Sequence, residues 1–79
     1  MCFLRVMSEA DDLKRKFGQR VRALRERLGI SQQEFAHSVK LDRTYIGSVE
    51  RGERNVSLVN IHKLAAGLNV RAEELLNAE

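Results

Sequence analysis

The chain has 79 residues, a length that suits one domain and no more. It is 43% hydrophobic and 32% charged, a composition typical of a globular protein rather than a disordered one. A single Cys excludes an internal disulfide, and one Cys with two His is too few for a structural zinc site. We therefore expect a reducing, cytoplasmic location and no metal or other cofactor. No apolar run approaches the roughly 20 residues of a membrane span, so we expect no membrane partner.

The net charge of +3 is unevenly distributed along the chain. Residues 13–29 contain seven Lys or Arg and one Glu, whereas residues 1–12 are acidic overall. A basic segment of this kind is either a solvated helix face or a surface for nucleic acid. Charge alone does not separate the two interpretations.

The sequence has no Pro and only five Gly, which favours helices and predicts an all-α fold class. The first predicted helix begins at Leu13 and ends at Gly29, because apolar residues recur between them at helical spacing. This stripe consists of Leu13, Phe17, Val21, Leu24 and Leu28. Residues 1–12, in which Met7 is an alternative start, are expected to form a partly disordered N-terminal extension, and residues 13–79 the folded domain.

Two short helices with a tight connection are predicted in the middle of the chain. Ser31 and Glu34 form a capping box at the start of the first of them. Asp42 is a suitable N-cap for the second, which ends at Gly52. The inward positions are Phe35, Ala36, Val39, Ile46 and Val49. The connection over residues 39–41 is so short that the two helices must cross steeply, which is the layout of a helix-turn-helix.

Two further helices complete the predicted domain. Ser57 caps the first of these, and Asn69 closes it because Asn tolerates the left-handed conformation. Its apolar stripe consists of Leu58, Ile61, Leu64, Ala65 and Leu68. A last short helix over residues 72–77 would bury Leu75 and Leu76. The prediction is five short helices around one core.

The outer face of the third predicted helix carries polar side chains near its first turn. These residues are Arg43, Thr44, Tyr45 and Ser48. An Arg can make a bidentate contact to guanine, and a Thr offers both a hydroxyl and a methyl group to base edges. In a helix-turn-helix this helix lies in the major groove, so the pattern indicates DNA recognition.

Three segments carry a family resemblance: ISQQEFA at residues 30–36, LDRTYI at 41–46 and VERG at 49–52. They resemble the lambda-repressor-like (Cro/C1-type, XRE) helix-turn-helix family, and residues 41–58 are similar to the controller proteins of restriction–modification systems. The resemblance implies a five-helix lambda-repressor-like fold, with residues 13–79 as the DNA-binding and dimerisation domain. It further implies a sequence-specific transcriptional regulator that binds palindromic operators in double-stranded DNA as a homodimer. RNA polymerase is a further expected partner, and the expected location is the bacterial cytoplasm, at the nucleoid.

The resemblance also implies roles for matched residues. Base edges would be contacted by Arg43, Thr44, Tyr45 and Ser48. Phosphates would be contacted by Gln32, Arg51, Arg54 and Asn55. Arg25 and Glu50 would form a structural ion pair between the first and third helices. Tyr45 suits a base, the sugar–phosphate chain or packing within the fold, and Lys40, where the family often has Gly, is expected to have a positive φ.

A dimer interface is expected on the last segment of the chain. Apolar residues gather there beyond those that the core stripes use, with a polar neighbour, and the candidates are Asn69, Val70, Leu75 and Leu76. A surface of this kind is a natural isologous seam between two copies. The alternative is that these residues close the core of their own chain.

Other functions remain as alternatives. A phage-type repressor and an antitoxin-like autoregulator share the fold, and a non-specific nucleic-acid binder would depend mainly on residues 14–16. A basic protein-interaction module is the alternative of another class, but such a helix would present apolar anchors where Arg43, Thr44 and Tyr45 stand. We expect no enzyme, because Cys2, His37 and His62 are far apart and no catalytic motif accompanies them.

Overall fold

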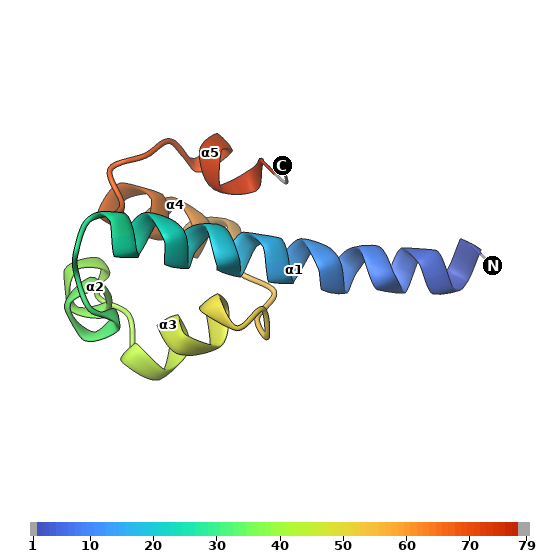
Figure 1. Ribbon diagram of the computed structural model, residues 1–79, viewed down its shortest axis with the longest axis horizontal. Coiled ribbons are helices and arrows are strands. Elements are labelled where there is room, and N and C mark those ends of the chain that lie inside the picture. The colour runs from blue at the N-terminus through green and yellow to red at the C-terminus, as the bar shows by residue number, and fades with distance from the viewer. Residues whose placement is uncertain (1, 78–79) are drawn as a thin grey trace.

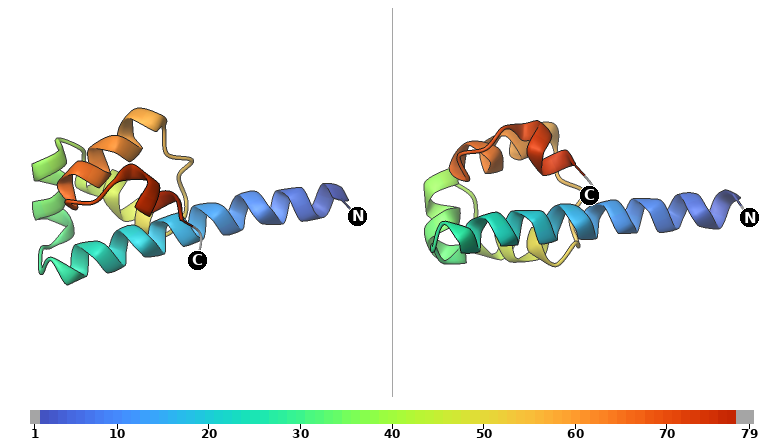
Figure 2. Two further views of the ribbon diagram at one scale, coloured as in Figure 1. Left: turned by 90° about the horizontal axis from the view of Figure 1, so that it is seen from above. Right: turned by 45° about the horizontal axis from the view of Figure 1, so that its top comes forward.

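The computed structural model describes residues 2–77, with side chains described from Glu9 to Asn77. These residues form five helices and no strand, which confirms the all-α prediction (Figure 1). The helices are α1 (Cys2–Arg27), α2 (Gln32–Val39), α3 (Arg43–Glu50), α4 (Leu58–Gly67) and α5 (Ala72–Leu76). The C-terminal half of α1 packs against α3 and α5, and its N-terminal half projects beyond the other helices (Figure 2).

The start of α1 differs from the prediction. Residues 2–12, expected to be partly disordered, continue α1 as helix, so that α1 is 26 residues long rather than beginning at Leu13. No Gly or Pro interrupts these residues. Three ion pairs at helical spacing also stabilise this part of α1: Asp11 with Lys14 at 3.8 Å, and Asp12 with Arg15 at 3.4 Å and with Lys16 at 3.1 Å. The lysine of the closest pair lowers the pKa of the Asp12 carboxyl through its hydrogen bond.

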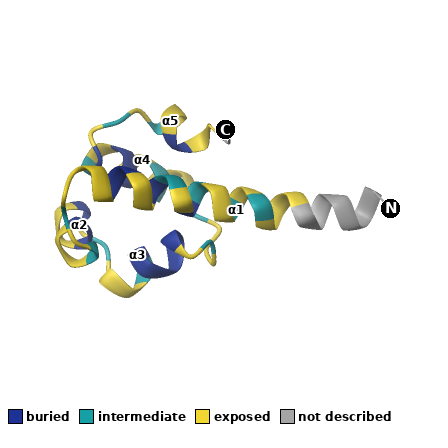
Figure 3. Cartoon of the chain, in the orientation of Figure 1, coloured by how far each residue is buried: buried dark blue, intermediate teal, exposed yellow. Residues whose placement is uncertain are grey.

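One core joins all five helices, as predicted. Its fully buried side chains are Val21, Phe35, Ile46, Val49, Leu64 and Leu75. The predicted stripes are wrong at their ends, because Leu13, Leu28 and Leu58 are exposed. Leu28 follows the last residue of α1, and Leu58 is the first residue of α4, so both lie at helix ends. Figure 3 shows that the exposed part of α1 continues beyond the segment that packs against the other helices.

Two glycines allow close helix packing that the sequence did not predict. A Cβ atom at Gly18 of α1 would lie 2.2 Å from the carbonyl oxygen of Val49 in α3. A Cβ atom at Gly67 of α4 would lie 2.3 Å from Cγ1 of Val39 in α2. Real Cβ atoms do not approach so closely, so these two contacts set how near α1 comes to α3 and α4 to α2.

The predicted helix caps are largely present. Ser31 and Glu34 form the capping box, with hydrogen bonds of 3.0 and 2.8 Å. The Ser57 hydroxyl accepts a hydrogen bond from the backbone N–H of Asn60. Asp42 occupies the N-cap of α3 but its side chain makes no capping hydrogen bond. The first turn of α3 therefore keeps backbone N–H groups that its own cap does not use.

Two non-glycine residues have positive φ, and both positions were expected to favour it. Lys40 ends α2 at φ 59°, and Asn69 follows α4 at φ 61°. Lys pays a steric cost in this left-handed region because its Cβ crowds the backbone, whereas Asn tolerates it better.

We expect Lys40→Gly to stabilise the fold by up to about 1 kcal/mol, because Gly adopts this conformation without the Cβ penalty. Asn69→Gly is the matched control and should gain less. Urea unfolding of the three proteins measures the difference. A loss of stability in Lys40→Gly, or an equal change in both variants, would contradict this account of the turn.

Candidate nucleic-acid interface

The turn between α2 and α3 consists of residues 40–42. Within it, the Leu41 backbone N–H donates to the carbonyl oxygen of Ala36 at 3.0 Å, and the Lys40 N–H donates to that of His37 at 3.2 Å. These bonds and the positive φ at Lys40 reverse the chain, so that α3 leaves α2 at a steep angle (Figure 1). The predicted helix-turn-helix is therefore present.

The first turn of α3 is its exposed end. Arg43 and Thr44 are both exposed, and among the described residues neither side chain has a hydrogen bond or ion pair. The following residues of α3, from Ile46 to Glu50, are buried. Two of the four predicted base-contacting residues are thus available for a ligand without breaking any internal contact.

The opposite end of α3 is held by a buried ion pair. Nε of Arg25 donates to Oε2 of Glu50 at 2.7 Å, and Nη2 donates to Oε1 at 3.0 Å. A third guanidinium nitrogen, Nη1, donates to the carbonyl oxygen of Ile30 at 2.9 Å. The hydrogen bonds with Glu50 raise the pKa of Arg25, against the lowering effect of burial. The structural ion pair that the resemblance implied is present and bidentate, the geometry in which such pairs are strongest.

The Gln32 side chain takes part in this ion pair, and its predicted phosphate contact stays a prediction. Its Nε2 donates to Oε1 of Glu50 at 3.0 Å, and the residue is partly buried. Gln32 was predicted to contact a phosphate. Its side chain instead points into the protein, because the Glu50 carboxylate has an acceptor site that Arg25 leaves open. The second amide hydrogen of Gln32 remains as a donor for an outside partner such as a phosphate.

Ser48 also differs from its expected role. It is only 6% exposed, its hydroxyl donates to the carbonyl oxygen of Tyr45 at 2.7 Å, and its Oγ accepts from Nε of Arg54 at 2.9 Å. Five residues after Arg43 on α3, Ser48 faces the loop that follows the helix rather than the solvent. In this conformation its hydroxyl is engaged within the protein, so base contact by Ser48 stays a prediction that would require these hydrogen bonds to open.

Tyr45 and Arg54 form a small cluster with Asn60. The Arg54 guanidinium lies 5.2 Å from the centroid of the Tyr45 ring, which is a cation–π contact. The Tyr45 hydroxyl accepts a hydrogen bond from Nδ2 of Asn60 at 3.1 Å. Tyr45 is partly buried and so links α3 to α4 and to the loop between them. Of the roles considered for Tyr45, the structure shows packing within the fold. The same cluster orients the Arg54 side chain beside α3.

The two remaining predicted phosphate contacts, Arg51 and Asn55, are exposed. Arg51 makes two hydrogen bonds with Glu53, at 3.0 and 3.2 Å, which raise the pKa of Arg51 and lower that of Glu53. A phosphate would therefore either compete with Glu53 for Nε and Nη2 of Arg51 or bind through Nη1, which Glu53 does not contact. Asn55 lines a shallow cavity of about 140 Å³ together with Lys14 and Arg54.

The predicted dimer residues fall into two groups. Leu75 is 1% exposed and closes the core of its own chain, which corrects its assignment to an interface. Leu76 is 57% exposed, Asn69 is exposed and Val70 is partly buried. The backbone of α5 is tied to α1 by Arg20, whose Nε donates to the carbonyl oxygen of Glu74 at 2.8 Å, and this orientation turns Leu75 inward and Leu76 outward.

The structure adds Leu13 and Phe17 to the surroundings of Leu76. The three residues line a common cavity of about 140 Å³ between α1 and α5. Leu13 and Phe17 were predicted to belong to the core stripe of α1. Their nearness to Leu76 depends on how α5 packs, which the helical period of α1 does not reveal.

The described residues hold no cluster of three or more His, Cys, Asp or Glu that could bind a metal ion. None of the described helices combines the length and apolar character that a membrane crossing requires. His37 and His62 are exposed on separate helices, and the Cys2 side chain lies outside the described residues.

Comparison with known proteins places this geometry in a family. A family model described as helix-turn-helix matches residues 21–75. Control protein C.MunI from Mycoplasma sp is 47% identical over 68 residues, which cover 85% of this chain and 92% of that protein. Control protein C.BamHI from Bacillus amyloliquefaciens is 43% identical over 68 residues, covering 85% and 84%.

Solved structures agree with these relatives. The restriction–modification controller protein C.AhdI from Aeromonas hydrophila is 57% identical, with a TM-score of 0.75 over 77% of this chain and 92% of that one. The controller protein C.Esp1396I, solved as a tetramer in complex with its natural 35 base-pair operator, is 30% identical, with a TM-score of 0.74 over 84% and 92%. The chain therefore belongs to the XRE-type helix-turn-helix family of non-enzymatic transcriptional regulators, and restriction–modification controller proteins are among its relatives.

Proposed function

We propose that the chain is a sequence-specific DNA-binding transcriptional regulator that controls the genes of a restriction–modification system. The observation that carries the proposal is the exposed first turn of α3, where Arg43 and Thr44 stand free at the end of a helix-turn-helix. The control proteins among its relatives support the regulated system, and the C.Esp1396I complex with its operator supports the ligand.

In this proposal the first turn of α3 enters the major groove. The Arg43 guanidinium donates to the O6 and N7 acceptors of a guanine, and Thr44 contacts an adjacent base edge. Arg54 and Asn55, in the loop after α3, contact the sugar–phosphate backbone, which positions the helix without reading sequence. Arg54 is already oriented for this by Ser48 and Tyr45.

The same proposal includes a homodimer on a palindromic operator. A single short recognition helix makes few base contacts, and a two-fold dimer doubles them on half-sites that lie about 34–36 Å apart. The protein would act in the cytoplasm, on operators in the nucleoid. RNA polymerase would be its partner when it activates rather than represses.

A selection of bound duplexes from a random pool tests the function and supplies the operator. We expect an inverted repeat, and a selection that enriches no sequence would refute the proposal.

On the selected operator, Arg43→Ala should cost about 1–3 kcal/mol of binding free energy and relax the preference at one position per half-site. Arg54→Ala should weaken the operator and a scrambled duplex alike and reduce the salt slope. Equal loss on both duplexes for Arg43→Ala would remove Arg43 from base recognition.

The adjacent leucines of α5 test the dimer. Leu76→Asp should give a monomer with a nearly unchanged fold, because this exposed side chain contributes to the proposed seam rather than to the core. Leu75→Ala should instead cost about 2–5 kcal/mol of unfolding free energy, because it leaves a cavity in the core. Sedimentation at about tens of micromolar, the range of weak dimers, and urea unfolding measure the two effects. A monomeric wild-type protein under these conditions would rule out the dimer.

A further inference from the structure

A basic turn of α1, over residues 14–16, lies beside the loop that follows α3. The loop turns at Gly52, where φ is 79°. A Cβ atom at Gly52 would lie 2.8 Å from Cα and 3.2 Å from the backbone nitrogen of Arg15. The loop backbone therefore packs directly against α1 at Arg15, and the residue type at position 52 permits this approach.

The side chain of Arg15 leaves this contact toward solvent. It is 58% exposed, and its one partner among the described residues is Asp12, with Nη2 3.4 Å from Oδ1. The same carboxylate lies closer to Lys16, at 3.1 Å. One carboxylate thus serves two cations, and Arg15 is the more loosely held of the two.

The two arginines of the loop itself are more firmly engaged. Arg51 is bound by both oxygens of Glu53, and Arg54 is bound by Ser48 and stacks on Tyr45. A phosphate that approaches the loop therefore meets two arginines that already have partners. Arg51 is neutralised by Glu53, and Arg54 is held in one orientation by Ser48 and Tyr45. Arg15, on the adjacent helix, offers guanidinium donors that the fold does not require.

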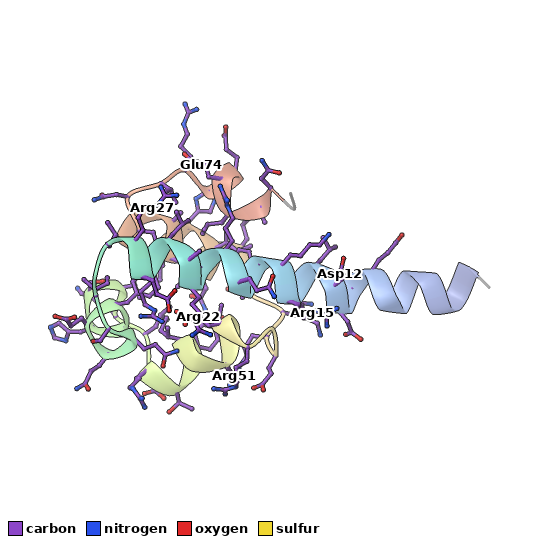
Figure 4. All side chains as sticks on the ribbon, viewed as in Figure 1. Asp12, Arg15, Arg22, Arg27, Arg51 and Glu74 are labelled. Carbon is purple, nitrogen blue, oxygen red and sulfur yellow. The ribbon has the colours of Figure 1, made fainter. Side chains whose placement is uncertain are left out.

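The side of the helix on which Arg15 lies agrees with this role. In Figure 4, Arg15 and Arg51 both lie on the side of α1 that faces α3, whereas Arg27 lies on the opposite side. Lys14, next to Arg15, lines the same cavity as Arg54 and Asn55. The basic surface of the loop thus continues onto α1 without a break in the fold.

We propose that Arg15 is a further contact to the DNA backbone, which extends the phosphate-binding surface of the loop after α3 onto α1. This inference rests on the proposed DNA-binding function and adds a contact from a helix outside the helix-turn-helix. A phosphate takes the place of Asp12 as the partner of Arg15. The exchange costs little, because an exposed ion pair at this separation is weak, whereas a phosphate accepts a bidentate, charge-assisted contact.

The test is the salt dependence of binding for the full chain, on the selected operator and on a scrambled duplex. Each phosphate neutralised contributes about 0.9 to the slope of log K against log salt. Arg15→Gln should lower the slope by about 0.9, which corresponds to about eightfold weaker binding at 0.1 M salt, on both duplexes alike. Arg27→Gln is the matched control, because it removes the same charge from an exposed position on the opposite side of α1, and its slope should be unchanged.

Two further variants make the result specific to the side chain. Arg15→Lys keeps the charge and should keep the slope, and it also serves if Arg15→Gln does not fold. Asp12→Asn removes the competing carboxylate and should tighten binding about two- to fivefold, the range that an exposed ion pair implies. Thermal unfolding followed by circular dichroism checks that each variant is folded.

The outcomes separate this inference from the proposed function. Equal slopes for Arg15→Gln and Arg27→Gln, in a wild-type protein that binds its operator, would overturn the Arg15 contact and leave the proposed function intact. Weaker binding of Arg15→Gln to the operator alone, with an unchanged slope, would make Arg15 a base contact and would also overturn the proposal. A wild-type protein that binds no duplex would overturn both.

Discussion

The buried ion pair between Arg25 and Glu50 is the interaction on which the arrangement of the DNA-reading helix depends. Glu50 is the last residue of α3, where the backbone carbonyls already give the helix end a partial negative charge. A buried carboxylate at that position needs a cation, and Arg25 supplies one with two hydrogen bonds. The same guanidinium reaches the Ile30 carbonyl, so a single side chain links α1, the start of the helix-turn-helix and the end of α3. At Gly18, the backbone of α1 also lies directly against the last carbonyls of α3.

This constraint divides α3 into two ends with different tasks. Its C-terminal end is immobilised against α1, and its N-terminal end has no internal partner among the described residues at Arg43 and Thr44. A ligand that engages the free end meets a helix whose position is already set, so little ordering remains to be done on binding. The two cations near α3 also differ in how firmly the protein holds them. Arg54 is oriented by packing, whereas Arg15 is exposed and loosely held.

Local signals allowed much of this fold to be predicted. The helix caps at Ser31 and Ser57 depend on neighbouring residues, which the sequence displays directly. The positive φ at Lys40 was implied by the family resemblance. The ion pair was implied by the family resemblance. The internal partners of Gln32 and Ser48 were not predicted, because Glu50 and Arg54 are brought to them only by tertiary packing. Likewise, Leu75 and Leu76 are equally apolar, so the sequence does not show which of the two is buried. In the fold, the hydrogen bond from Arg20 ties the backbone of α5 in an orientation that buries Leu75 and exposes Leu76.

The unfolding free energy of an Arg25 variant tests the central claim most directly. Arg25→Ala leaves Glu50 buried without its cation and should cost about 3–5 kcal/mol in urea unfolding. Arg22 offers a matched control on the same helix, because it pairs with Glu26 at 3.1 Å but both side chains are exposed. Arg22→Ala should cost about 0.5 kcal/mol or less. A loss in Arg25→Ala no greater than that in Arg22→Ala would show that α3 is held by packing alone and would contradict the account.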